Sequence, residues 1–243
     1  MSWAEVYASD WQAVWGLWIA PMVFLGFRAR RGPPERGAIA AALAPVDTYC
    51  IAFAVATLVD PLFTTLLVRE WGGGSSTVFA TLVGLFFVLL GDFRVFLLAF
   101  GLSRNPASLI SKAALLRAAL FTAVVPAGAY ALFFGGKSLA ASELDPRWLW
   151  FMHESLFIAL ALGLRQLWLP RRAELSAPGR RFLSAILVYS AAYYALWASA
   201  DLIILAGFDA GYALRILPNQ LYYAFWIPFV WWRFGKSAAP SDA

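Results

Sequence analysis

Three acidic residues stand inside long apolar stretches of this sequence: Asp60, Glu154 and Asp201. Ionisable groups within a membrane are costly to bury, and they commonly mark functional sites. Burial and a nearby like charge both favour the protonated form of a carboxyl, and a held proton is what a general acid needs. The three residues are therefore the candidate catalytic acids, and at least one is expected to hold a proton at neutral pH.

Aromatic and polar side chains recur at helical spacing around these acids. A cage of ring faces stabilises a carbocation, which forms when a proton is added to an apolar polyene. The same side chains also suit a polar and aromatic network that only holds helices together, so both interpretations stay open. The candidate substrate-binding residues are Trp150, Phe157, Tyr194, Trp197, Asn219, Tyr222, Tyr223 and Trp226.

A second polar group comprises Asp47, Asp92, Arg94 and His153. His153 is adjacent to Glu154 but about 100° around the helix, which places it at the edge of the same cavity. Asp92 and Arg94 are expected in the other half of the membrane, away from the three acids, and Asp47 is near the interface. The single histidine and the single cysteine, Cys50, disfavour a metal site, and no cofactor is expected.

The composition predicts an all-helical integral membrane protein. Of 243 residues, 62% are hydrophobic and 14% charged, whereas soluble domains have about a quarter of their residues charged. Continuous apolar runs of about 20 residues favour helices over a β-barrel. One domain, 1–243, is therefore expected to hold seven transmembrane helices, near Trp11–Phe27, Val46–Val68, Val78–Gly101, Ala113–Phe134, Trp148–Leu169, Phe182–Phe208 and Tyr212–Phe234.

The loops predict the orientation. Basic residues dominate every second loop, whereas the alternate loops are balanced or acidic, so the positive-inside rule places the N-terminus outside and the C-terminus in the cytoplasm. The net charge of +5 thus reflects topology in a cell membrane and not nucleic-acid binding. The basic residues expected on the cytoplasmic side are Arg28, Arg30, Arg31, Arg36, Arg104, Lys112, Arg171, Arg172, Arg180, Arg181, Arg233 and Lys236.

Two segments, 46–58 and 153–165, align with each other, and the surroundings of Asp92 align with those of Asp201. The pattern indicates an inverted repeat of three helices with halves 1–101 and 113–208, followed by an extra helix 211–234. Shared apolar composition is the alternative explanation of the same similarity.

The motif PVDTYCIAF at 45–53 resembles the Pro-x-Glu-Glu/Asp-aromatic signature of the membrane-integral lycopene cyclases. Those proteins consist of two related three-helix halves. The chain is also similar in size and acid placement to the small membrane terpene cyclases of meroterpenoid pathways, of whose acids Asp60 and Asp201 would be the nearest counterparts. Thr48 departs from the signature where its second acid belongs.

We therefore expect a membrane-embedded isoprenoid or carotenoid-type terpene cyclase whose hydrophobic substrate enters from membrane lipid. Alternatives are a proton-coupled transporter, a non-catalytic subunit of a membrane complex, and a lysoplasmalogenase-like hydrolase, the last indicated by LLGD at Asp92 and SAD at Asp201. A retinal protein is disfavoured, because the last apolar segment has no lysine in its middle for a Schiff base.

Overall fold

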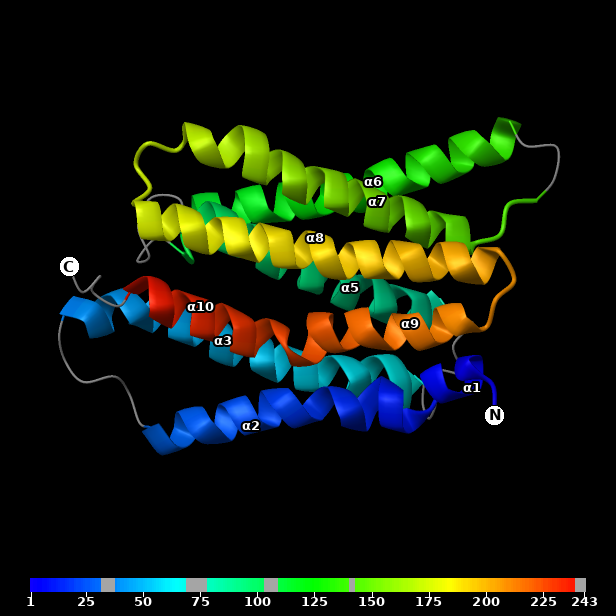
Figure 1. Ribbon diagram of the computed structural model, residues 1–243, viewed down its shortest axis with the longest axis horizontal. Helices are drawn as coiled ribbons and strands as arrows, with labels where there is room; N and C mark the ends of the chain where they lie inside the picture. Colours follow the sequence, from blue (N-terminus) through cyan, green and yellow to red (C-terminus); the bar gives the residue numbers. More distant parts are fainter. Residues whose placement is uncertain (32–37, 69–77, 103–108, 140–142, 239–243) are drawn as a thin grey trace.

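The computed structural model describes residues 1–31, 38–68, 78–102, 109–139 and 143–238. It is 89% helical, and the described residues form no strand. The long helices lie side by side along the longest axis, and the chain reverses direction at the two ends of the bundle (Figure 1). Four helices among the described residues are long and apolar enough to cross a membrane: Ala44–Leu67, Val78–Gly101, Lys112–Leu139 and Ala177–Leu205.

The helical elements follow one another closely along the chain. Several long helices continue directly into a short π-helical or 3₁₀ segment. In order they are α1 Trp3–Tyr7, η1 Trp11–Trp15, α2 Gly16–Arg31, α3 Ala38–Pro61, η2 Leu62–Leu67, α5 Val78–Gly101, α6 Lys112–Leu139, α7 Arg147–Gly163, η4 Leu164–Trp168, η5 Leu169–Arg171, α8 Ala177–Leu205, α9 Ala210–Asn219, η6 Gln220–Ala224 and α10 Trp226–Ala238.

The outer surface of the bundle is apolar, as expected for a protein in lipid. On α6, Leu116 and Leu120 are each more than half exposed, whereas Ala118 and Thr122 on the opposite face are buried. In this part of α6 small residues face inward and large apolar ones outward, whereas a soluble helix exposes a polar face. This pattern supports the expectation of a membrane protein.

Two helices change pitch directly after a proline. η2 begins after Pro61, and η6 begins two residues after Pro218. Proline has no N–H to donate to the preceding turn, so local rearrangement must satisfy the freed backbone groups. The backbone of η6 also receives a hydrogen bond from another helix, because Tyr189 of α8 donates from its hydroxyl to the Leu221 carbonyl at 2.9 Å.

The C-terminus of α8 is closed by a glycine. Gly207 has φ +88°, its N–H donates to Ile204, and the N–H of Phe208 donates to Ile203, which together form a Schellman motif. The sequence predicts this helix to continue to Phe208, and the motif explains why it ends at Leu205 instead.

Several predicted segments agree closely with the helices. Val78–Gly101 coincides with α5, and α6 extends the predicted Ala113–Phe134 by a few residues. The predicted Trp11–Phe27 corresponds to η1 and α2, which end at Arg31, and the predicted Val46–Val68 corresponds to α3 and η2, which begin at Ala38. The basic positions Arg36 and Arg104 lie outside the described residues. The bundle places the remaining basic loops together at the end that holds the C-terminus, hereafter the basic end, and α1 lies at the other end (Figure 1).

Candidate functional site

A cavity of about 180 Å³ lies within the bundle near the end that carries α1. It is enclosed by side chains from α1, α5, α7, α8, α9 and η6. Most of them are aromatic, and the polar ones include a carboxyl, an imidazole and a guanidinium. Its lining residues are Tyr7, Val88, Trp150, His153, Glu154, Tyr194, Trp197, Arg215, Asn219, Tyr222 and Tyr223.

Glu154 is the carboxyl of this cavity. It is 3% exposed, and its Oε2 atom has no hydrogen-bond partner in the described part of the protein. A buried carboxyl oxygen without a partner is costly unless the group is protonated or meets a ligand or water. Glu154 is thus free to exchange a proton with a molecule in the cavity.

His153 lines the same cavity and is held by a second acid. Its Nε2 atom lies 3.1 Å from Oδ2 of Asp92, and the Tyr194 hydroxyl donates to the other oxygen of Asp92. Asp92 is fully buried. A carboxylate on one ring nitrogen orients an imidazole and selects its tautomer.

The position of Asp92 differs from the sequence-based expectation. Asp92 was expected away from the site, but it supports both His153 and Tyr194, which line the cavity. Counting residues from the ends of its own apolar segment placed Asp92 in the other half of the membrane. It could not show that α5 brings this residue opposite α7 and α8 at the level of the cavity.

The short helix α1 closes one side of the cavity. Its Ser2 forms a capping box with Glu5, and Asp209 accepts hydrogen bonds from the N–H groups of Trp3 at 2.6 Å and Ala4 at 3.1 Å. These contacts place the Tyr7 ring in the cavity wall. Tyr7 was not among the predicted site residues, because it precedes the first apolar segment.

Asn219 connects the wall formed by α1 with the wall formed by α8. Its Oδ1 accepts from the Trp197 indole at 2.9 Å, and its Nδ2 donates to the Tyr7 hydroxyl at 3.3 Å. Both ends of the amide are therefore occupied. Asn219 fixes the orientation of two aromatic rings that face the cavity.

Asp201 differs from Glu154 because it is ion-paired. Its Oδ1 accepts from Arg147 at 2.9 Å and from Arg215, and Asp201 itself is fully buried. The two arginines come from different elements, since Arg147 begins α7 and Arg215 lies on α9. Two guanidinium groups therefore compensate the charge of the Asp201 carboxylate, whereas Oε2 of Glu154 has no hydrogen-bonded partner among the described residues.

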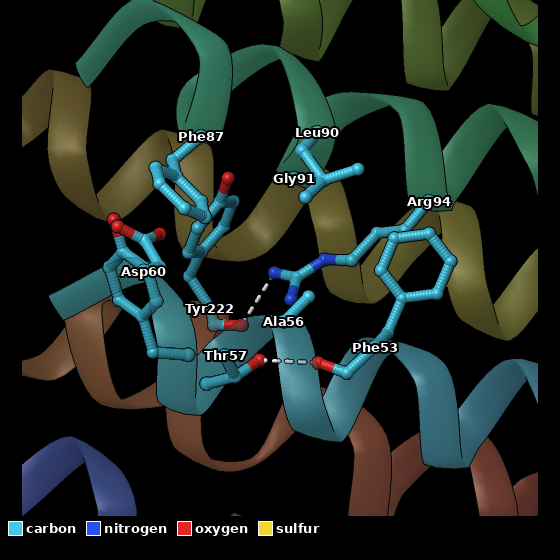
Figure 2. Close-up of a pocket in the computed structure, with 10 residues that line it drawn as sticks. Phe53, Ala56, Thr57, Asp60, Phe87, Leu90, Gly91, Arg94 and Tyr222 are labelled. Atoms are coloured by element: carbon cyan, nitrogen blue, oxygen red, sulfur yellow. Dashed lines mark hydrogen bonds between the residues drawn. The ribbon is translucent and has the colours of Figure 1, made fainter. Parts of the chain in front are cut away.

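Asp60 lies in a separate, smaller cavity. This cavity has a volume of about 20 Å³, which is enough for about one water molecule, and Arg94 also lines it (Figure 2). Arg94 is 3% exposed and donates to the Tyr222 carbonyl at 2.5 Å. Its guanidinium lies 4.2 Å from the centre of the Tyr222 ring. Arg94 thus satisfies a carbonyl of η6 and brings a positive charge into the cavity that contains Asp60.

The two cavities share a wall formed by Tyr222 and Tyr223. Tyr222 lies against α5 at Gly91, where an added Cβ atom would come within 1.4 Å of the tyrosine hydroxyl. Only glycine allows the ring this close approach. Asp60 and Glu154 therefore lie in neighbouring but distinct cavities, whereas Asp201 pairs with Arg215, which lines the cavity of Glu154.

Other predicted site residues lie outside the cavity wall. Phe157 is fully buried and stacks on Tyr194 with ring centres 4.1 Å apart. Trp226 is also fully buried and donates to the Tyr49 hydroxyl at 3.1 Å. Both were predicted to bind substrate, but they pack behind the residues that face the cavity.

Asp47 lines neither of the two cavities. It forms a bidentate pair with Arg28 of α2, with distances of 2.5 and 2.6 Å. Such pairs join neighbouring helices. Its expected position near the membrane interface stays a prediction, and the structure gives it a specific partner, Arg28.

The large cavity thus combines a carboxyl able to donate a proton, an imidazole supported by an acid, and aromatic faces. This set suits proton transfer to and from an apolar molecule. Among the described residues, no group of three His, Cys, Asp or Glu side chains is placed to hold a metal ion. Comparison of the chain with protein-family models, with curated proteins and with solved structures finds no match.

Proposed function

We propose that this protein is a membrane-embedded isoprenoid cyclase in which Glu154 protonates a hydrophobic polyene or its epoxide. One observation carries the proposal: a buried carboxyl with an unpartnered oxygen lines an aromatic cavity inside an apolar bundle. Preorganised groups in a water-poor site contribute most to stabilising charge that develops in a transition state. Here the developing charge is a carbocation.

The proposed reaction needs no other reactant. Glu154 adds a proton to a terminal double bond, and a neighbouring double bond attacks the resulting cation to form a ring C–C bond. His153 then removes a proton from the adjacent carbon, which restores a double bond. For a polyene the product is an isomer of the substrate, and a proton transfer that returns Glu154 to the acid form completes the cycle.

The walls of the cavity suit the cationic intermediate. Tyr194, Trp197 and Tyr222 present aromatic surfaces, and rings attract a cation placed over their faces. Arg215 also lines the cavity, but its charge is paired with Asp201. The ion pair therefore limits the repulsion that a free guanidinium would exert on the cation.

The cavity volume indicates how much of the substrate reacts inside. An engineered protein cavity of about 150 Å³ binds benzene, so about 180 Å³ accommodates one six-membered ring. A long polyprenyl or carotenoid chain would place one end in the cavity and leave the remainder among the helices or in lipid. This size favours formation of a single terminal ring.

The proposed topology has seven spans in the cell membrane, with the N-terminus outside. Besides the four long helices, we assign the stretches 11–31, 147–171 and 210–238, which are divided by π-helical segments. The Arg- and Lys-rich end then faces the cytoplasm. A reporter fused after Lys236 should be active in the cytoplasm, and one inserted after Leu144 should be active outside. The reverse result would contradict this orientation.

The catalytic proposal is tested by isotope incorporation. Purified protein in liposomes is incubated in D₂O with lycopene or with the terminal epoxide of a linear polyprenyl chain. We expect a cyclic product, which in the case of lycopene carries one added deuterium. Glu154→Gln keeps the size of the side chain but cannot deliver the proton, so turnover should fall by about 100-fold or more.

The matched control is Glu174→Gln, which removes an exposed acid paired with Arg172 at the basic end. It should leave turnover unchanged. Full turnover in Glu154→Gln, or no cyclic product from either substrate with the unmodified protein, would contradict the proposal.

A proton-coupled transporter is the second candidate. The interruptions of α3 by η2 and of α9 by η6 resemble the discontinuous helices that form transporter sites. In that case liposomes would show substrate-dependent proton uptake without a chemical product. Measuring internal pH in the same preparation separates the two functions.

A further inference from the structure

A third and larger cavity, of about 700 Å³, lies at the basic end of the bundle. It opens between η4, η5, the first turns of α8 and α10. Four arginines line it: Arg165, Arg180, Arg181 and Arg233. No acidic side chain is among its described lining residues.

Two of these guanidinium groups are held by the protein itself. Arg165 donates from Nε to the Ser184 hydroxyl at 2.9 Å. Arg180 donates from Nη1 to the Leu175 carbonyl at 2.9 Å. Each contact uses one nitrogen and orients the group, and the other nitrogens of an arginine fork remain able to bind an anion such as a phosphate.

The same cavity has an apolar side. Leu169, Pro170, Ala185 and Val188 line it, and Val188 is 43% exposed on the outer surface of α8. An apolar path therefore leads from the arginines to the lipid-facing surface. A small hydrophilic anion would leave this apolar side unused, whereas an amphiphile with an anionic head occupies both parts.

We infer that this cavity binds the phosphate headgroup of an anionic phospholipid, with an acyl chain along Ala185 and Val188. Basic pockets between transmembrane helices bind cardiolipin and similar headgroups at the cytoplasmic side. The proposed orientation places this end at the cytoplasmic leaflet, where anionic lipids are abundant. The cavity is distinct from the one that contains Glu154, and no residue lines both.

The test measures lipid binding to the purified full chain in detergent by native mass spectrometry. Cardiolipin, phosphatidylglycerol and phosphatidylcholine are titrated separately, and inorganic phosphate is added as a competitor. We expect the two anionic lipids to bind more tightly than phosphatidylcholine. The double variant Arg165→Gln/Arg181→Gln should raise their Kd by roughly 30-fold, on the scale of about fivefold for each arginine.

The control variant Arg30→Gln/Arg117→Gln removes two exposed charges outside the cavity and should leave the Kd unchanged. If the double cavity variant does not yield folded protein, Arg181→Gln alone serves, with an expected loss of about fivefold. Unchanged binding in the cavity variant, or an equal loss in the control, would overturn the inference. Competition by inorganic phosphate at equal phosphate concentration would show a soluble phosphate site and would also overturn it.

Discussion

The two neighbouring cavities of the bundle share Tyr222 and Tyr223 but differ in how their acids are balanced. The smaller one holds Asp60 together with Arg94, so a negative and a positive group line the same 20 Å³ space. The larger one, of about 180 Å³, holds Glu154, whose Oε2 has no partner among the described residues. One cavity has its charges compensated internally, and the other has room for a guest molecule.

This difference shows that burial alone does not identify a functional acid. Asp60, Asp201 and Glu154 are each 6% exposed or less. Asp201 is neutralised by Arg147 and Arg215, and Asp60 bonds to Thr64 and shares its cavity with Arg94. Glu154 alone among the three combines an unpartnered oxygen with adjoining space for a substrate, so the proposed chemistry is assigned to it.

The largest expected effect compares the acids of the two cavities directly. Glu154→Gln should lower cyclase turnover by a factor of about 10² to 10⁴, the usual contribution of a general acid. Asp60→Asn should change turnover by less than about tenfold, because its cavity admits only about one water molecule. Both variants are assayed with lycopene under identical conditions. Equal losses in the two variants would mean that the cavities act as one site.

Much of the fold can be predicted from the sequence. Apolar runs of about 20 residues require helices in lipid, and they locate α5 at its observed bounds. The end of α8 was missed because Gly207 terminates the helix through backbone hydrogen bonds that hydropathy does not reveal. The proposed inverted repeat stays a prediction.

The candidate site is less predictable than the fold. Spacing along one helix correctly groups Trp150, His153 and Glu154 around one cavity. It does not reveal partners from other helices, such as Arg147 for Asp201 or Asp92 for His153. These contacts depend on how each helix is rotated and shifted along its axis, which packing decides.

The second-largest expected effect is a change in stability, and it distinguishes Asp201 from Glu154. Asp201→Asn leaves two guanidinium groups facing a neutral amide, each of them less than a quarter exposed. Breaking a buried ion pair in this way should reduce the free energy of unfolding by about 3 kcal/mol. In Glu154→Gln no ion-paired cation loses its counter-charge, so the free energy of unfolding should change by only about 0.5 kcal/mol. Thermal unfolding in detergent provides the measurement.

A double variant checks the cause of the Asp201 effect. Adding Arg147→Gln to Asp201→Asn removes one of the stranded charges and should recover part of the lost stability. Failure to recover any of it would indicate that Asp201 stabilises the bundle through packing and not through its charge.

The smallest expected effect concerns the wall between the two cavities. Gly91→Ala would place a methyl group 1.4 Å from the Tyr222 hydroxyl, and the rigid ring must shift to avoid it. Overpacking of this kind costs about 1–3 kcal/mol. Gly84→Ala on the same helix is the matched control, because its added Cβ atom meets nothing within 4 Å. The control should be neutral or more stable by up to about 1 kcal/mol, since alanine loses less backbone entropy than glycine.

A shift of Tyr222 should also disturb both cavities, because its ring lines each of them and its carbonyl binds Arg94. We therefore expect Gly91→Ala to lower turnover as well as the midpoint of thermal unfolding, and Gly84→Ala to lower neither. If Gly91→Ala lowered stability but not turnover, the position of Tyr222 would matter for packing alone. If both glycine variants behaved alike, the close approach of Tyr222 to α5 at Gly91 would not be needed to keep the two cavities apart.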